Sequence, residues 1–128
     1  MSRDRRSVLV YNETKQTSLC AQVTVANTGL SRMIGLLGRR SLEPNTGIWL
    51  VPANAIHTIG MMFRFDVILI DKNYRVVGLR ERIRPFSMTW PNFHAATVLE
   101  LPADTISKSR TEIGDQLRLE RPMAPLPR

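Results

Sequence analysis

The sequence predicts an α+β domain that is mostly β, a compact mixed sheet curled towards a small barrel with two short helices. About seven short runs have the alternating or fully apolar pattern of strands, whereas only two segments suit helices. The strands do not alternate strictly with the helices, which argues against a doubly wound parallel sheet. The length of 128 residues fits one domain with one hydrophobic core.

Three predicted strands lie in the first half of the chain. The runs SVLVY (7–11), LCAQVTVA (19–26) and GIWLV (47–51) are short, rich in branched apolar residues and bounded by polar segments. The second run alternates in part between apolar and polar residues, and it contains the single cysteine, Cys20. We expect this cysteine to be a small core residue.

The segment between the second and third strands predicts the first helix. Its apolar residues recur at i, i+3, i+4 and i+7, which places them on one helical face. Asn27 or Thr28 can cap the N-terminus, and Gly38 can end the helix. The apolar face consists of Leu30, Met33, Ile34 and Leu37.

A β-hairpin is predicted from FDVILID (65–71) and RVVGLRERIR (75–84), because the residues between them favour a turn. Further strands follow at TVLEL (97–101) and QLRLE (116–120). Between these two strands, PADTISKSR (102–110) suits a short helix with Pro102 at or near its first turn.

The two ends of the chain differ in composition from the rest. Residues 1–6 form a basic tail, residues 7–120 the predicted domain, and residues 121–128 a proline-rich tail. Each tail carries a net charge of +2, so residues 7–120 hold only +3 of the total +7. The overall basicity is therefore weak support for nucleic-acid binding.

Cysteine usage and hydropathy predict a cytoplasmic protein. One cysteine cannot form an internal disulfide, which favours a reducing compartment. The apolar run after the N-terminal arginines is too short for a signal peptide and is followed by polar residues. No window approaches the roughly 18 apolar residues that span a bilayer, so no membrane association is expected.

Several blocks of the sequence resemble the DUF192 family of small bacterial and archaeal proteins. They are GLLGRRSL (35–42), GIWLVPANAIHTIGMMFRFDVILID (47–71), RVVGL (75–79), ATVLELPADTI (96–106) and the late Gly114-Asp115. The resemblance covers roughly residues 20–120. It implies a compact, β-rich single domain, and it implies no activity, because the family has none established.

The chain departs from the family pattern at several positions. Met62 stands where a basic residue is common, and Arg64 stands where a proline is common. Many members have a cysteine shortly before the IHT motif, whereas this chain reads PANA at residues 52–55. Asp104 occupies the position of the glycine in the LELPAG motif. A function that needs this cysteine as a nucleophile, redox group or metal ligand therefore cannot apply to this protein.

The block IHTIGMMFRFD predicts a candidate site in which His57, Thr58, Met61 and Asp66 bind a ligand. Asp66 interrupts an apolar strand, and a buried carboxylate must be paired or hydrogen-bonded. Its carboxylate can accept a hydrogen bond from an amine or hydroxyl group of a ligand. Alternatively, it is structural and accepts backbone N–H bonds from the Gly60 turn or from His57 or Thr58. The structural alternative is the more common arrangement for a buried acid.

Catalysis by His57 and Asp66, as in a small hydrolase, is a further alternative. No convincing nucleophile accompanies the pair, so an enzyme is not favoured. Methionines and histidines could bind a soft metal, but their spacing follows no ligand pattern. No metal or cofactor is expected. We interpret the chain as a non-catalytic binding module for an unidentified small ligand or protein partner.

The returning strand of the hairpin carries an arginine stripe, defined as Arg80, Arg82 and Arg84. Their period of two places them on one strand face, where guanidinium groups can bind an anionic partner or nucleic acid. The aromatic residues Trp90 and Phe93 follow in a loop. The alternative is a solvated edge strand whose arginines deter aggregation, and this alternative is favoured.

Overall fold

The computed structural model describes residues 7–26, 43–54, 63–84 and 89–120. All seven predicted strands are present. The helix predicted at residues 27–38 lies outside the described ranges, within which α2 is the one helix. The elements are β1 (Ser7–Asn12), β2 (Thr17–Ala26), β3 (Thr46–Leu50), β4 (Phe65–Ile70), β5 (Val76–Ile83), β6 (Thr97–Pro102), α2 (Thr105–Ser109) and β7 (Leu117–Glu120).

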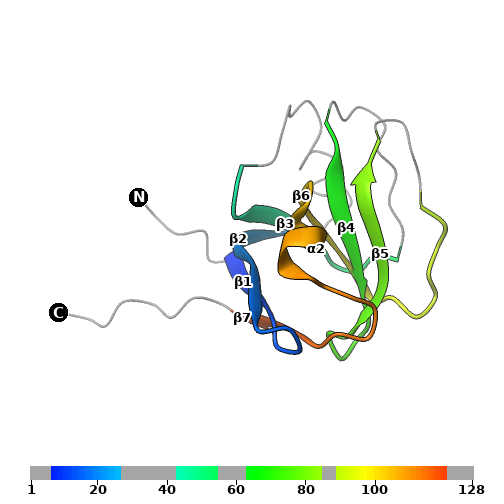
Figure 1. The fold of residues 1–128 in the computed structure, drawn as a ribbon. Helices are drawn as coiled ribbons and strands as arrows, with labels where there is room; N and C mark the ends of the chain where they lie inside the picture. The colour runs from blue at the N-terminus through cyan, green and yellow to red at the C-terminus, as the bar shows by residue number, and fades with distance from the viewer. Residues whose placement is uncertain (1–6, 27–42, 55–62, 85–88, 121–128) are drawn as a thin grey trace.

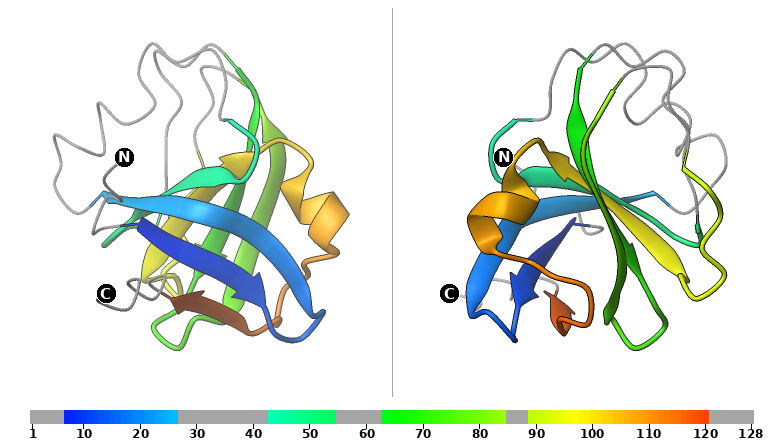
Figure 2. Two further views of the ribbon diagram at one scale, coloured as in Figure 1. Left: turned by 90° about the vertical axis from the view of Figure 1, so that its left-hand side faces the viewer. Right: turned by 45° about the vertical axis from the view of Figure 1, so that its right-hand side comes forward.

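The strands form one curled sheet in the order β5-β4-β6-β3-β2-β1-β7. The pair β2–β3 is parallel and the other pairs are antiparallel, so the sheet is mixed as predicted. The sheet curls into a half-barrel, with α2 lying across the gap between β2 and β4 (Figures 1 and 2). The fold is therefore mostly β.

The two edges of the sheet approach each other at one end of the half-barrel. Arg75, just before β5, forms an antiparallel bridge with Gln116, just before β7. The Leu117 amide donates to the Tyr74 carbonyl at 2.8 Å, and the Val76 amide donates to the Asp115 carbonyl at 2.9 Å. These bonds pair backbone groups that would otherwise lie on open edges.

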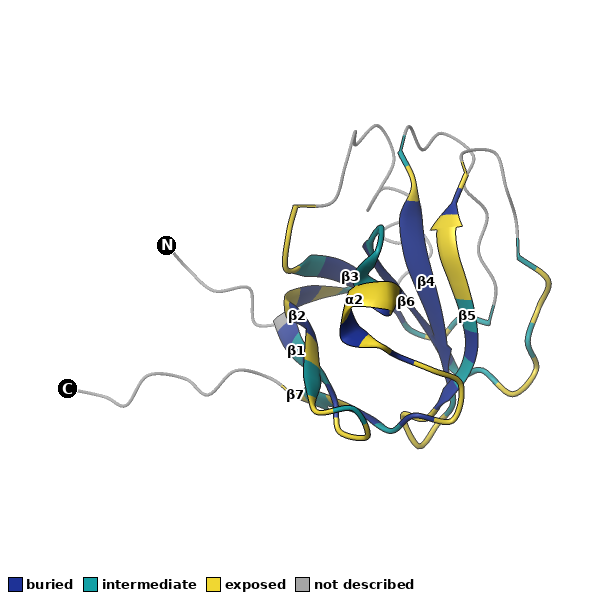
Figure 3. Ribbon diagram, in the orientation of Figure 1, coloured by how far each residue is buried: buried dark blue, intermediate teal, exposed yellow. Residues whose placement is uncertain are grey.

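Two apolar clusters pack on opposite faces of the sheet, because side chains of a strand alternate between faces. The inner cluster lies inside the curl and includes Ile68, Ile70 and the Ile106 side chain of α2. The outer cluster includes Phe65 and Val67. Every residue of β4 is buried (Figure 3), as expected for an apolar strand that is covered on both faces.

Gly47 in β3 offers a direct test of this packing. A Cβ atom at this position would lie 2.7 Å from the Glu100 carbonyl oxygen and 2.8 Å from a methyl carbon of Leu101. Because the carbonyl belongs to β6, an interior strand that pairs with β4 and β3, it cannot move aside without disrupting the sheet. We expect Gly47→Ala to lower the free energy of unfolding by about 2 kcal/mol in urea denaturation.

Gly78 provides the matched control for this substitution. A Cβ atom there would lie 3.2 Å from its nearest neighbour, the far end of the Leu69 side chain, which can adjust. Gly78→Ala is therefore expected to cost clearly less than Gly47→Ala. If both substitutions lowered the free energy of unfolding equally, the close approach of β3 and β6 would not be what restricts position 47 to glycine.

Candidate functional site

Asp66 joins three segments that are far apart in the sequence. Its side chain is 0% exposed. Its Oδ1 atom accepts a hydrogen bond from the Arg82 amide at 2.9 Å, and its Oδ2 atom accepts one from the Ile106 amide at 2.8 Å. The first donor lies in β5 and the second in the first turn of α2. The carboxyl group thus fixes both segments to β4.

The segments that Asp66 holds have unusual backbone conformations. Arg82 has φ of 50° and Asp104 has φ of 75°, in the left-handed region that is costly for side chains other than glycine. The Arg82 guanidinium also pairs with the Asp104 carboxylate at 3.1 Å. The family motif has glycine where this chain has Asp104, and the positive φ gives the physical reason for that preference.

The predicted helix at 102–110 starts later than expected. Pro102 is the last residue of β6, Asp104 is the N-cap residue, and the helix begins at Thr105. Pro102 therefore lies near the first turn, as predicted, but outside the helix. The end of a strand tolerates the fixed φ of proline and its missing N–H donor.

Of the four predicted ligand-binding residues, only Asp66 lies in the described ranges. His57, Thr58 and Met61 lie outside them, as does Gly60. The expected backbone donors to Asp66 were these neighbours. The described donors instead come from β5 and α2, 16 and 40 residues further along the chain. Since each carboxyl oxygen of Asp66 already accepts a backbone bond, the geometry favours a structural role.

The arginine stripe does not have the geometry that its spacing predicted. Arg80 pairs with Val67 and Ile83 pairs with Phe65, with a register shift between the two pairs. Paired residues lie on the same face, so one extra residue in β5 reverses the alternation at this β-bulge. The prediction of one shared face is wrong for Arg80, Arg82 and Arg84.

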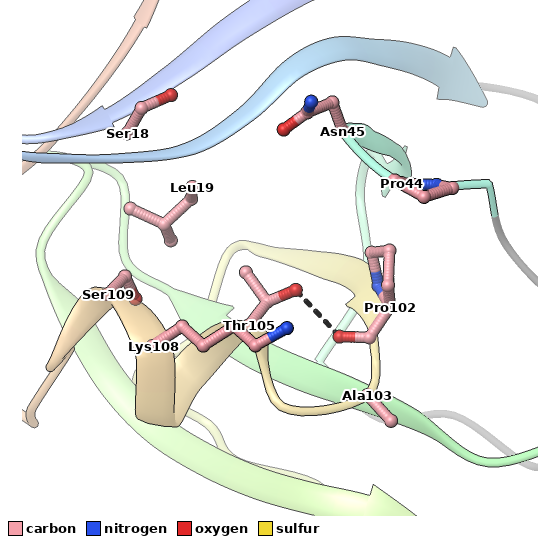
Figure 4. A pocket seen from close by; sticks show the side chains of 9 residues that line it. All are labelled: Ser18, Leu19, Pro44, Asn45, Pro102, Ala103, Thr105, Lys108 and Ser109. Atoms are coloured by element: carbon pink, nitrogen blue, oxygen red, sulfur yellow. Dashed lines mark hydrogen bonds between the residues drawn. The ribbon is translucent and has the colours of Figure 1, made fainter.

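A pocket of about 380 Å³ opens between α2, β2 and the segment before β3 (Figure 4). The loop from Pro102 to Thr105 forms one wall, where the Thr105 hydroxyl donates to the Pro102 carbonyl at 2.7 Å. Among the described residues that line it, Lys108 is the one that carries a charge. These residues are Ser18, Leu19, Pro44, Asn45, Pro102, Ala103, Thr105, Lys108 and Ser109.

Asp66 does not line this pocket, yet it fixes the wall. The Ile106 amide that it binds follows directly after Thr105, and Asp66 itself pairs with Leu101, just before Pro102. The segment between these two anchors is the pocket wall. The sequence did not predict the pocket because its walls come from three segments that are distant in the chain. Only the Pro102–Thr105 segment belongs to a family motif, and that motif does not by itself indicate a cavity.

A second buried polar cluster, the Asn12 cluster, links the β1–β2 hairpin to the segment before β7. The Asn12 amide nitrogen donates to Asp115 at 2.9 Å and to the Thr111 hydroxyl at 3.1 Å. Lys15 donates to both Asp115 oxygens at 3.0 and 2.8 Å. The Glu112 amide also donates to Asp115 at 3.0 Å. Every donor in this cluster has an acceptor, which is typical of a structural network.

Charges in the Asn12 cluster stabilise each other. Burial raises the pKa of Asp115, but the hydrogen bonds from Lys15, Asn12 and Glu112 outweigh it, so the net shift of this pKa is downward from 3.8. The hydrogen bond to Asp115 raises the pKa of Lys15. The one sequence signal for this cluster was Gly114-Asp115, which belongs to the family resemblance.

Cys20 is a core residue, as predicted. It is 0% exposed, and its thiol donates to the Asn45 carbonyl at 3.1 Å. Burial raises the pKa of this thiol to about 11, so it is protonated at neutral pH and is a poor nucleophile. Within the described ranges, no three His, Cys, Asp or Glu side chains are grouped so that they could hold a metal ion.

The described segments contain no helix of the length and apolarity that crossing a membrane requires.

Comparisons with known proteins agree with the sequence resemblance. Residues 10–119 match the family DUF192, described as "Uncharacterized ACR". The chain is similar to UPF0127 protein PH1112 of Pyrococcus horikoshii, with 26% identity over 115 residues, covering 86% of this chain and 97% of the relative. Neither description names an activity.

Two crystal structures share the fold. One, from Sinorhizobium meliloti, is provisionally described as a transcription regulator; it has a TM-score of 0.76 and 21% identity, with 93% of this chain and 96% of that chain covered. The other, from Novosphingobium aromaticivorans, is a protein of unknown function with a TM-score of 0.70 and 18% identity, covering 88% and 83%. At these identities the likeness concerns the fold alone.

Proposed function

This chain belongs to the DUF192 family, whose function is uncharacterised, and we propose that it is a non-catalytic binding module for a small anionic molecule. The observation that carries the proposal is the pocket beside α2, where Lys108 is the charged member of the lining that the structure describes. Figure 4 shows the Lys108 side chain extending along α2 towards the Pro102–Ala103 wall. A carboxylate or phosphate group would lie against this ammonium group.

The polar lining favours a small molecule with hydrogen-bonding groups. Ser18, Asn45 and Thr105 contribute hydroxyl and amide groups, while Leu19 and the two prolines contribute apolar contact. A mixture of apolar walls and a few polar groups is typical of small-molecule sites. In this proposal Asp66 is a positioning residue that holds the wall. His57, Thr58 and Met61, which lie outside the described ranges, stay predicted ligand-binding residues.

The described geometry favours binding over the hydrolase alternative. Asp66 is engaged by two backbone amides, and the Cys20 thiol is buried and protonated. A general base needs a free acceptor within reach of substrate, and a nucleophile needs exposure and activation. Neither group meets these needs.

The proposal is tested by titrating the ¹⁵N-labelled protein with acetate, benzoate and inorganic phosphate while recording amide chemical shifts. We expect the largest changes at residues of the pocket lining, among them Asn45, Thr105 and Lys108. Lys108→Ala is expected to weaken binding about tenfold, because a charge-assisted hydrogen bond is lost. Lys72→Ala, which removes an exposed lysine in the β4–β5 turn, is the matched control and is expected to bind normally.

Two results would contradict the proposal. One is the absence of saturable shifts at the pocket with all three anions. The other is an equal loss of affinity in Lys108→Ala and Lys72→Ala, which would indicate general charge attraction and not a site.

A further inference from the structure

Two large aromatic side chains are almost fully exposed in the loop between β5 and β6. Trp90 is 86% exposed and Phe93 is 89% exposed. They lie three residues apart, and they are the most exposed large apolar side chains in the described part of the chain. Two large rings this exposed on one short segment make it the first candidate for a surface that meets another molecule.

The loop that carries these rings is fixed to the fold through Asn92. The Asn92 side chain donates to the Val77 carbonyl of β5 at 3.2 Å, and its backbone amide donates to the Asn54 carbonyl at 3.0 Å. The His94 amide closes back onto the Asn92 side chain at 3.0 Å. Asn92 therefore holds the two rings outwards on a defined backbone, so little freedom is lost on binding.

Arg80 lies on the same face of β5 as this loop. Gly78 and Arg80 pair with Leu69 and Val67, so both belong to the outer face of the sheet. A Cβ atom on Gly78 would lie 3.3 Å from the side-chain nitrogen (Nδ2) of Asn92, which places the loop directly over that part of β5. Arg80 is exposed, and in the described residues no carboxylate forms an ion pair with it.

We propose that Trp90, Phe93 and Arg80 form a stacking surface for single-stranded nucleic acid. Exposed rings on a fixed loop can stack on successive unpaired bases, and a neighbouring guanidinium group can contact the phosphate backbone. The positive charge of Arg80 is the sign that a negatively charged nucleic-acid backbone requires. It is separate from the α2 pocket and does not depend on the small-anion proposal.

A protein partner fits this surface less well. The core of a protein interface is a continuous apolar area, whereas Asn92 and His94 flank Phe93 in the sequence, and the charged Arg80 lies on the face of β5 that the loop covers. A duplex also fits less well, because its bases are already stacked on each other. The arrangement therefore points to unpaired bases.

The test measures binding of fluorescein-labelled oligo(dT) and oligo(rU), each about 12 nucleotides long, by fluorescence anisotropy. A duplex of the same length is the comparison. Trp90→Ala and Phe93→Ala are each expected to weaken single-strand binding about tenfold. Arg80→Ala is expected to reduce the salt dependence of log K by about 0.7, the value for one lost phosphate contact to a single strand.

Matched controls separate stacking from general attraction. Ile113→Ala removes another exposed apolar side chain, and Lys72→Ala removes one exposed positive charge in the β4–β5 turn; both are expected to bind normally. Trp90→Phe is expected to keep affinity within about threefold, since a phenyl ring still stacks. In this variant the base-induced quenching of tryptophan emission is expected to vanish, because Trp49 is partly buried.

Four outcomes would overturn the inference. The first three are no single-strand binding by the unaltered protein at about 50 mM salt, binding that survives loss of either ring, and equal weakening by Arg80→Ala and Lys72→Ala. Concentration-dependent dimerisation that Trp90→Ala abolishes, without nucleic-acid binding, would also overturn it and would assign the surface to a second copy of the chain.

Discussion

Replacing Asp66 with alanine is expected to lower the free energy of unfolding by about 4 kcal/mol. The substitution removes the acceptor of the backbone amides of Arg82 and Ile106. Asp66 is 0% exposed, so water cannot readily replace its carboxylate as the acceptor. Each buried, unsatisfied donor costs about 1–3 kcal/mol. The bulge in β5 and the start of α2 then lose their common anchor. Urea denaturation at neutral pH measures the effect.

Two further variants define the cause. Asp66→Asn is expected to lose less than alanine, because its amide oxygen can still accept one of the two bonds. Asp104→Asn is the matched control: Asp104 is exposed at 45% of its side chain, and its pair with Arg82 is expected to contribute less than about 1 kcal/mol. If Asp66→Ala and Asp104→Asn were equally destabilising, Asp66 would not be the anchor that its contacts indicate.

Replacing Asp115 with alanine is expected to cost about 3 kcal/mol, because it removes the shared acceptor of the Asn12 cluster. Asn12 is 0% exposed and Asp115 is 5% exposed, so water cannot readily take over their bonds. The β1–β2 hairpin would lose its main polar link to the segment before β7. Glu112→Gln is the control, since Glu112 lies at the exposed end of the cluster, and only a small change is expected there.

The contribution of Asp115 is also expected to depend on pH. Its pKa in the folded protein lies below the ordinary value of 3.8, so the folded state favours the ionised form. The stabilisation is therefore fully present above about pH 4 and is lost as the pH falls through the folded pKa. The stability difference between the unaltered protein and Asp115→Asn is expected to shrink as the pH falls from about 5 to about 2. A difference that stays constant over this range would contradict the ionic contribution.

The pattern of short apolar runs determined the strands, because alternation and turn chemistry act between residues close in the chain. The hairpin around Asp71 illustrates this. Its side chain accepts bonds from the Asn73 and Arg75 amides, both at 2.9 Å, as expected for a turn that starts with aspartate. The burial of Cys20 and of both faces of β4 followed from the same local patterns.

Local patterns could not predict the arginine stripe or the partners of Asp66. A single extra residue in β5 reversed the alternation that the spacing of Arg80 and Arg82 implied. No signal near Asp66 indicated that its donors would come from β5 and α2. The α2 pocket and the Asn12 cluster likewise bring together residues that are up to 103 positions apart.

The sequence by itself determined that this protein is mostly β, where its strands run and which family it belongs to. Only the tertiary structure decided which strands became neighbours, where the bulge fell and which polar groups met. The physical reason is that strand formation depends on the period of apolar residues, whereas the order and register of strands depend on how all segments pack together. The role of Asp66 shows the difference. Its position in an apolar strand was visible in the sequence, but its task of holding a bulge and a pocket wall arises only from the folded arrangement.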